Sequence, residues 1–168
     1  MTTERLARPV PTHLVEVRLR PDYPDAEGQA ALALLHGLGL FAIKDCRVSR
    51  VYELRGALNV GQLQQVAREL LADPVTHEFK FPQPANAVFN GQNFWRVEVW
   101  LKASVTDPVG ETVRAAIAEM GLPEPQSARV GQVYHLSGKC GRNQLEKAVA
   151  RSLANQVIHK VIVSEAHA

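Results

Sequence analysis

Long apolar runs, clustered cysteines and a strong net charge are all missing from this sequence of 168 residues. No stretch approaches the roughly 18 apolar residues of a membrane span, and the first residues lack the apolar core of a secretory signal. Cys46 and Cys140 stand apart from each other and from any histidine cluster, which argues against a disulfide framework or a zinc site. The 19 Lys and Arg residues nearly balance the 17 Asp and Glu residues. We therefore expect a cytoplasmic protein with a folded core and no nucleic-acid or membrane partner.

Recognisable catalytic motifs are also missing. The sequence has no glycine-rich nucleotide loop, no nucleophile elbow and no zinc-protease motif. The GKCG segment at 138–141 lacks the flanking residues of a phosphate loop, so we interpret it as a tight turn. His77 and His159 have no ligand at metal-binding spacing, and we interpret both as packed strand residues, with Cys46 and Cys140 as unreactive thiols. The expectation is a chain with no catalytic residue, no bound cofactor and no metal.

An internal repeat is the clearest positive feature. Residues 13–82 align without a gap onto residues 95–164, an offset of 82, and about 21 of the 70 aligned pairs are identical. Ordinary composition would give about four or five identities. VEVRL at 15–19 matches VEVWL at 97–101, and an aspartate followed three residues later by glycine recurs at Asp25 and Asp107. The chain is predicted to contain two copies of one unit: copy one (13–82) and copy two (95–164), with a flexible N-terminus (1–12) and a linker (83–94).

Each copy shows the pattern β-α-β-α-β. Alternating apolar residues at 15–19 and 97–101 predict a first strand. A helix follows, with Asp25 or Asp107 as its N-cap and Gly39 or Gly121 as its stop. Further patterns predict a long strand, a second helix and a last strand. The predicted buried residues of the first helix are Ala31, Leu34, Leu35 and Leu38 in copy one, and Val113, Ala116, Ile117 and Met120 in copy two; those of the last strand are Val75, His77, Phe79 and Phe81, and Val157, His159, Val161 and Val163.

A unit of this size buries too little surface to be stable alone, so the copies are expected to complete each other. The predicted fold is α+β: a pseudo-two-fold pair with antiparallel or mixed sheets and helices on one face. Copy two is the more apolar half. Ile158 and Ile162 replace Thr76 and Lys80 on the outward face of the last strand, and Trp100 replaces Arg18.

Six residues are candidates for contacts between the copies or with a partner: Arg47, Arg129, Trp95, Trp100, Ile158 and Ile162. Each copy has an arginine before its long strand, at 47 and 129, which fits either an anion or partner-carboxylate contact or a solvated charge. Trp95 and Trp100 stand near Phe94 at the start of copy two, where they fit either packing between the copies or a docking surface.

The order of these motifs resembles the PurS family of phosphoribosylformylglycinamidine synthase. Copy two carries the resemblance most fully, in VEVWLK (97–102), DPVG (107–110), ARVGQVYHL (128–136) and LANQVI (153–158). Copy one departs from it at Ala26, Ser49 and Asp73, but has a family-like proline at Pro74. Family members are usually single units that dimerise, so this chain resembles the dimer in one polypeptide.

The resemblance implies a subunit without catalytic activity of its own. It would join a glutaminase subunit to an ATP-dependent synthetase subunit in purine biosynthesis, so that ammonia passes between their active sites. ATP, magnesium and glutamine would be used by those partners and not bound by this chain. The resemblance also leaves open that the chain is part of a longer fused synthetase, and that it self-associates further.

Two other classes of protein share part of this pattern. A tandem regulatory module of the ACT type also repeats an α/β unit, but it predicts the order β-α-β-β-α-β and a glycine-containing ligand turn after the first strand. The corresponding connections here, at 21–24 and 103–106, contain no glycine. An RNA-recognition sheet would show several aromatic residues for base stacking on its central strands. The long strand of each copy has only one aromatic residue here, Tyr52 or Tyr134.

Overall fold

The computed structural model of the chain describes residues 8–82 and 94–166, without the side chains of Phe94 and Ala166. The predicted linker lies outside these residues except for Phe94, which belongs to a strand, and residues 1–7 of the predicted N-terminal segment lie outside them too. Two copies of the same element order follow one another along the chain, which confirms the predicted α+β fold class. Copy one contains β1 (Thr12–Leu19), α1 (Ala26–Gly37), β2 (Ile43–Arg55), α2 (Val60–Val66), the π-helical turn η1 (Ala67–Leu71) and β3 (His77–Lys80). Copy two contains β4 (Phe94–Leu101), α3 (Pro108–Glu119), β5 (Ser127–Gly138), α4 (Arg142–Ser152) and β6 (His159–Ala166).

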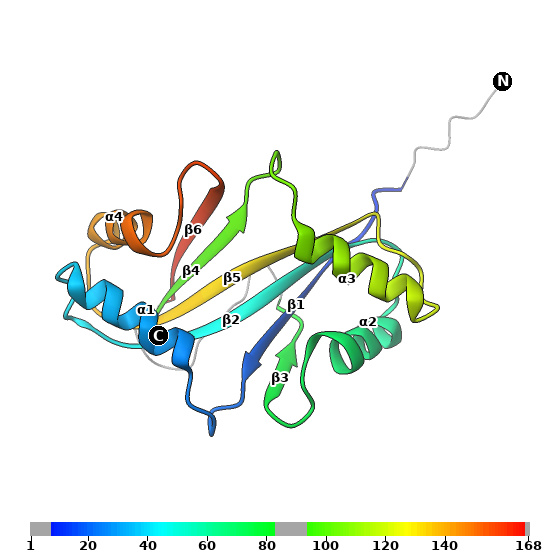
Figure 1. The fold of residues 1–168 in the computed structure, drawn as a ribbon, viewed down its shortest axis with the longest axis horizontal. Coiled ribbons are helices and arrows are strands. Elements are labelled where there is room, and N and C mark those ends of the chain that lie inside the picture. Colours follow the sequence, from blue (N-terminus) through cyan, green and yellow to red (C-terminus); the bar gives the residue numbers. More distant parts are fainter. Residues whose placement is uncertain (1–7, 83–93, 167–168) are drawn as a thin grey trace.

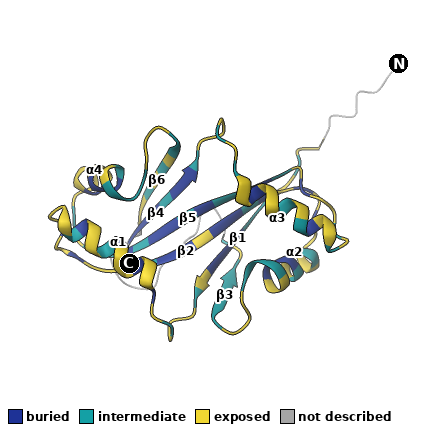
Figure 2. Ribbon diagram, in the orientation of Figure 1, coloured by how far each residue is buried: buried dark blue, intermediate teal, exposed yellow. Residues whose placement is uncertain are grey.

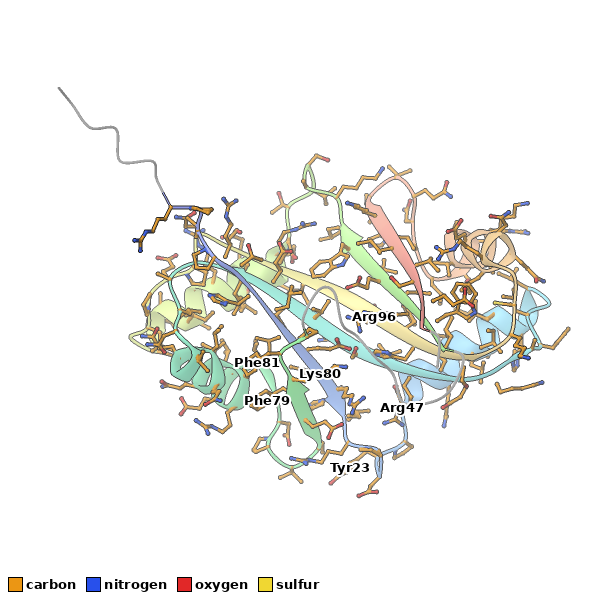
Figure 3. The ribbon with its side chains drawn as sticks, turned by 180° about the vertical axis from the view of Figure 1, so that it is seen from behind. Tyr23, Arg47, Phe79, Lys80, Phe81 and Arg96 are labelled. Carbon is orange, nitrogen blue, oxygen red and sulfur yellow. The ribbon has the colours of Figure 1, made fainter. Side chains whose placement is uncertain are left out.

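The strands form one antiparallel sheet in the order β3-β1-β2-β5-β4-β6 (Figure 1). Helices α1, α2, α3 and α4 lie on one face of this sheet, with α1 and α4 at one end and α2 and α3 at the other. Seen from behind, the strands lie in front of the helices (Figure 3). We call this second surface the back face.

The two copies are related by a pseudo-two-fold axis at the centre of the sheet. The long strands β2 and β5 pair antiparallel, and Arg50 lies directly opposite Gln132, its own equivalent at the offset of 82. On either side of this point, Ser49 pairs with Val133 and Val51 pairs with Gly131. Each of these pairs is the equivalent of the other at the offset of 82, as a two-fold axis requires. The outer pairings β1–β2 and β4–β5 repeat in equivalent register.

The first helix of each copy packs on the long strand of its own copy and also belongs to a core that the other copy shares. Ala31 and Leu35 of α1 belong to a core that contains Trp95, Val97 and Leu136 of copy two. Val113 and Ile117 of α3 belong to the second core, most of whose buried residues come from copy one, such as Val15, Val17, Leu54 and Leu63. Because each half contributes a helix to the core of the other, neither copy has a complete core by itself.

Helix ends follow the sequence signals. The side chains of Asp25 and Asp107 cap α1 and α3. Gly39 and Gly121 have φ of 89° and 76°, the left-handed conformation that ends a helix and that favours glycine.

The predicted buried face of α1 was wrong at two positions. Ala31 and Leu35 are buried, but 51% of Leu34 and 36% of Leu38 are exposed. In α3, Val113 and Ile117 are buried while Ala116 and Met120 are only partly so. Helical spacing predicts which side faces the sheet, but a single helix layer on the sheet leaves the flanks of that side open to solvent.

The last strand of each copy also begins later than predicted. Val75 and Val157 precede β3 and β6, and they are 67% and 78% exposed. The Asp73 side chain accepts hydrogen bonds from the backbone N–H groups of Val75 and Thr76, which holds this segment in a turn.

Candidate functional site

The aspartate before each first helix joins that helix to the following long strand. Asp25 Oδ1 accepts a hydrogen bond from Gly28 N (2.8 Å), and Asp25 Oδ2 accepts one from Val48 N (2.7 Å). Gly28 approaches β2 so closely that an added Cβ would stand 2.2 Å from the carbonyl oxygen of Cys46. The same contacts recur in copy two, at Asp107, Gly110, Val130 and Ala128. The repeated motif therefore has a structural role in both copies.

Arg47 anchors the loop between β1 and α1. Its guanidinium donates hydrogen bonds to the backbone carbonyls of Tyr23 (3.0 Å), Arg20 (3.3 Å) and Leu19 (3.5 Å). Figure 3 shows Arg47 and Tyr23 at the same end of the sheet. The contacts of Arg47 with backbone carbonyls differ from both sequence interpretations, an anion contact and a solvated charge.

Arg129 occupies the equivalent place in copy two. It donates a hydrogen bond to the Leu101 carbonyl, and its guanidinium carbon lies 5.6 Å from the centre of the Trp100 ring. A further contact of 4.0 Å joins Arg129 to the Glu53 carboxylate of copy one. Arg129 thus combines the loop contact with a contact between the copies.

The two tryptophans lie on opposite faces of the sheet. Trp95 is 4% exposed and packs beneath the helices, in the core that holds Leu35 of copy one. Trp100 is 8% exposed and packs on the back face with Val51 and Val133. Its ring covers Gly131, where an added Cβ would stand 2.7 Å from the ring carbons. Both tryptophans belong to clusters that include residues of copy one.

The two isoleucine candidates lie on the outer edge of copy two. Ile162 belongs to β6 and is 38% exposed. Ile158 precedes β6, and its carbonyl accepts a hydrogen bond from Lys102 N (2.8 Å). Neither isoleucine is close to the pairing of β2 with β5, because β4 separates β6 from these strands.

A polar cluster on the back face joins the two copies, and we call it the inter-copy cluster: Glu16, Ser49, Arg96 and His135. Glu16 Oε1 accepts hydrogen bonds from Ser49 Oγ (2.7 Å), His135 Nε2 (3.0 Å) and Arg96 (3.1 Å). A second Arg96 nitrogen lies 2.9 Å from Glu16 Oε2. Glu16 and Ser49 belong to copy one, whereas Arg96 and His135 belong to copy two.

Burial determines the electrostatics of this cluster. The Glu16 side chain is 0% exposed and that of Arg96 is 10% exposed. Burial alone would raise the pKa of Glu16, but the donors of His135, Arg96 and Ser49 together hold this pKa well below its ordinary value. Burial lowers the pKa of His135, so its ring is neutral at pH 7 and donates Nε2–H to the carboxylate. The cluster is a buried ion pair with two neutral donors.

The equivalent place on the other side of the axis is different in character. The equivalents of Arg96 and His135 are Leu14 and Glu53, and the equivalent of Ser49 is Gly131. Leu14 packs against the group formed by Trp100, Val51 and Val133. One side of the back face is therefore ionic and the other largely apolar, although the backbone is duplicated.

Sequence reasoning missed the inter-copy cluster, because strand alternation places Glu16 and Arg96 on polar faces without showing that they meet. One signal was available. In the offset alignment Leu14 of copy one corresponds to Arg96 of copy two, and Glu53 corresponds to His135. These changes in polarity and charge mark positions where the two copies have different partners.

The histidines and cysteines have structural environments. His77 Nδ1 accepts a hydrogen bond from Asp73 N (3.1 Å), and His159 Nδ1 accepts one from Asn155 N (2.9 Å). Burial raises the pKa of Cys46 to about 12 and also raises that of Cys140, so both thiols are protonated and weakly nucleophilic at pH 7. Within residues 8–82 and 94–166, no group of three His, Cys, Asp or Glu side chains could hold a metal ion. No helix in the same residues is long and apolar enough to span a membrane.

Two equivalent hollows lie on the helix face, one in each copy. They have volumes of about 390 and 380 Å³, and both are lined by Arg50, beside the pseudo-two-fold axis. The first also contains Glu27 and Ser49, whereas the second contains Val109 and Gly131 at the equivalent positions. Here too the copies share a shape but differ in chemistry.

A comparison with known protein families agrees with the duplicated architecture. A sequence profile described as PurS, phosphoribosylformylglycinamidine (FGAM) synthase, matches residues 12–83 and again residues 95–166. A solved structure of B. subtilis PurS is 28% identical, with a TM-score of 0.42, and the match covers 45% of this chain and 100% of that one. No curated protein sequence matched the chain. Because the profile matches most of the chain, the chain belongs to the PurS family of phosphoribosylformylglycinamidine synthase and contains two copies of the family's unit.

Proposed function

We propose that this chain is the adaptor subunit of a phosphoribosylformylglycinamidine synthase complex. In this role it joins a glutaminase subunit to a synthetase subunit and has no catalytic activity of its own. The complex converts formylglycinamide ribonucleotide, glutamine, ATP and water to formylglycinamidine ribonucleotide, glutamate, ADP and phosphate. ATP, magnesium and glutamine are used by the partner subunits.

The observation that carries this proposal is the double family match combined with the single sheet. The two matched segments form the two halves of one antiparallel sheet about a pseudo-two-fold axis. One chain therefore offers the surface that two separate units would form as a dimer.

An adaptor has a chemical purpose in such a reaction. Ammonia released from glutamine is lost to water unless the two active sites are held together. A rigid platform meets this need, and the two shared cores and the inter-copy cluster support a fixed relation between the two halves of this chain.

Reconstitution with the cognate glutaminase and synthetase subunits tests the proposal. We expect glutamine-dependent product formation to require the chain, and synthesis from added ammonium salt to depend on it much less. The purified chain alone should neither hydrolyse ATP nor release ammonia from glutamine. Equal glutamine-dependent rates with and without the chain would reject the adaptor role. Binding of an amino acid at micromolar affinity would favour a regulatory module instead.

A further inference from the structure

The pairing of β2 with β5 could form between two identical copies as well as between the two different ones. Its backbone register is symmetric about the axis, and the neighbouring strands repeat in equivalent register. Backbone hydrogen bonds therefore do not distinguish the pair in this structure, which we call the mixed pair, from a pair formed by copy one of two different chains, which we call the copy-one pair. Only side chains can favour one pair over the other.

The inter-copy cluster distinguishes these two pairs. In the mixed pair, Glu16 of copy one accepts hydrogen bonds from Arg96 and His135 of copy two. Copy one has no such donors at the equivalent positions, which hold Leu14 and Glu53. In a copy-one pair, each Glu16 side chain would therefore face a leucine and a second carboxylate. The two-fold axis would repeat this arrangement, so the pair would contain it twice.

Burial makes the loss of these donors severe. Strands β2 and β5 consist mainly of buried or partly buried residues (Figure 2), and the Glu16 side chain beside them is 0% exposed. A buried carboxylate that loses its cation disfavours the pair by on the order of a hundredfold or more. Ser49 would remain as a donor in a copy-one pair. One hydroxyl group does not replace the charge of Arg96.

Two other contacts of copy one do not remove this difference. Lys80 lies opposite Glu16 in the pairing of β3 with β1, which both pairs contain, so it favours neither of them. Arg47 could meet the Glu53 carboxylate of the other chain, as its equivalent Arg129 does at 4.0 Å in the mixed pair. The side chains of that contact are about a third exposed, so solvent weakens it.

Copy two has no such restriction, because Glu98, its equivalent of Glu16, would meet Arg96 and His135 of the second chain. Preventing the copy-one pair is nevertheless sufficient. Each chain contains one copy of each kind, so every pair of two copies two would leave two copies one without a partner. Neither copy has a complete core by itself, and the mixed pair is therefore the arrangement in which all copies are folded.

We propose that the inter-copy cluster determines which copies pair, because it stabilises the mixed pair and prevents the copy-one pair. Copy one is synthesised before copy two, and domains generally fold from the N-terminus during synthesis. A copy one that paired with itself would join two chains before either had made its copy two. The cluster keeps copy one available for copy two of its own chain. This inference does not depend on the proposed function.

The test removes the linker as a tether, because a tether alone favours pairing within one chain. A protease site is inserted between residues 83 and 93, the folded chain is cleaved, and the two halves are unfolded together in urea and refolded by dilution. Native mass spectrometry then measures the mixed pair, the copy-one pair and the pair of two copies two. We expect nearly all folded pairs to be mixed, with copy-one pairs below about 1%.

Two variants change the cluster, and a third is their control. Leu14→Arg with Glu53→His gives copy one the donors of copy two, and Glu16→Gln removes the buried charge. We expect each to raise the fraction of copy-one pairs by about tenfold or more. Ile162→Lys also introduces the residue of the other copy, but in β6, which β4 separates from the paired strands. We expect this control to behave as the wild type does.

Several results would overturn the proposal. One is a statistical mixture of the three pairs from the wild type, and another is a fraction of copy-one pairs that neither cluster variant raises. A control that raises this fraction as much as the cluster variants do would assign the selection to other residues. Failure of the wild-type halves to form mixed pairs would also contradict the proposal, because the side chains would then need the tether to select their partner.

Discussion

Replacing Arg96 by leucine, the residue at the equivalent position of copy one, tests the energetic role of the inter-copy cluster. The Glu16 side chain is fully buried and has Arg96 as its charged partner in the cluster. Removing one partner of a buried ion pair costs about 3–5 kcal/mol, because the remaining charge stays buried. His135 and Ser49 still donate to Glu16 in the variant. We therefore expect the lower end of this range, about 3 kcal/mol.

Urea unfolding at pH 7 measures this cost. With a slope of about 2 kcal/mol per molar urea, a loss of about 3 kcal/mol lowers the midpoint by about 1.5 M. Arg18→Leu is the control, because Arg18 pairs with Glu78 at 2.6 Å but its side chain is 45% exposed. Solvent screens such a pair, and the control should lose less than about 1 kcal/mol.

A second substitution separates buried charge from packing. Adding Glu16→Gln to Arg96→Leu removes the unpaired carboxylate while keeping an oxygen that accepts from Ser49 and His135. We expect the double variant to regain at least half of the lost stability. A double variant as unstable as the sum of the two single variants would refute the reasoning, as would a midpoint shift below about 0.5 M for Arg96→Leu alone.

Three further predictions concern glycine, pH and tryptophan. Gly28→Ala should lower the free energy of unfolding by more than about 3 kcal/mol, because the added Cβ would stand 2.2 Å from the Cys46 carbonyl oxygen. Gly37→Ala is the control: the space around Gly37 is open, so this substitution should be neutral or stabilising in thermal or urea unfolding. Because the pKa of His135 is lowered in the folded protein, the unfolded chain binds a proton at this histidine at a higher pH than the folded protein does. The free energy of unfolding should therefore fall as the pH drops below about 6.5. The His135→Gln variant should lose this part of the pH profile, and an unchanged profile would contradict the assignment. Trp100→Arg, which introduces the residue of copy one, should cost about 1–3 kcal/mol, and an unchanged melting temperature would show that Trp100 contributes little to the back face.

Local signals in the sequence predicted much of the fold. The offset alignment established the duplication, and strand alternation placed Val15 and Val17 on the helix face. The caps at Asp25 and Asp107 were predicted because a capping side chain acts on the backbone only three residues away. These features depend on near neighbours, and a sequence displays near neighbours directly.

The remaining features depend on distant partners. Glu16 and Arg96 are 80 residues apart, and nothing near either one shows that they form an ion pair. Leu34 fits the helical pattern of a buried residue, but its exposure depends on how far a single helix layer covers the sheet. Arg47 was expected at a surface or an anion, whereas its partners are carbonyls of a loop whose path the sequence does not show.

The pair at the centre of the sheet shows what fusion of the two copies permits. In a dimer of identical chains, the residue on the two-fold axis must face itself, and two arginines directly opposite each other on antiparallel strands would repel. In this chain Arg50 faces Gln132, so one position holds a cation while the other remains neutral. A substitution in a symmetric dimer also appears twice, once on each side of the axis. Joining the copies removes that doubling, and each side of this protein can acquire a surface of its own.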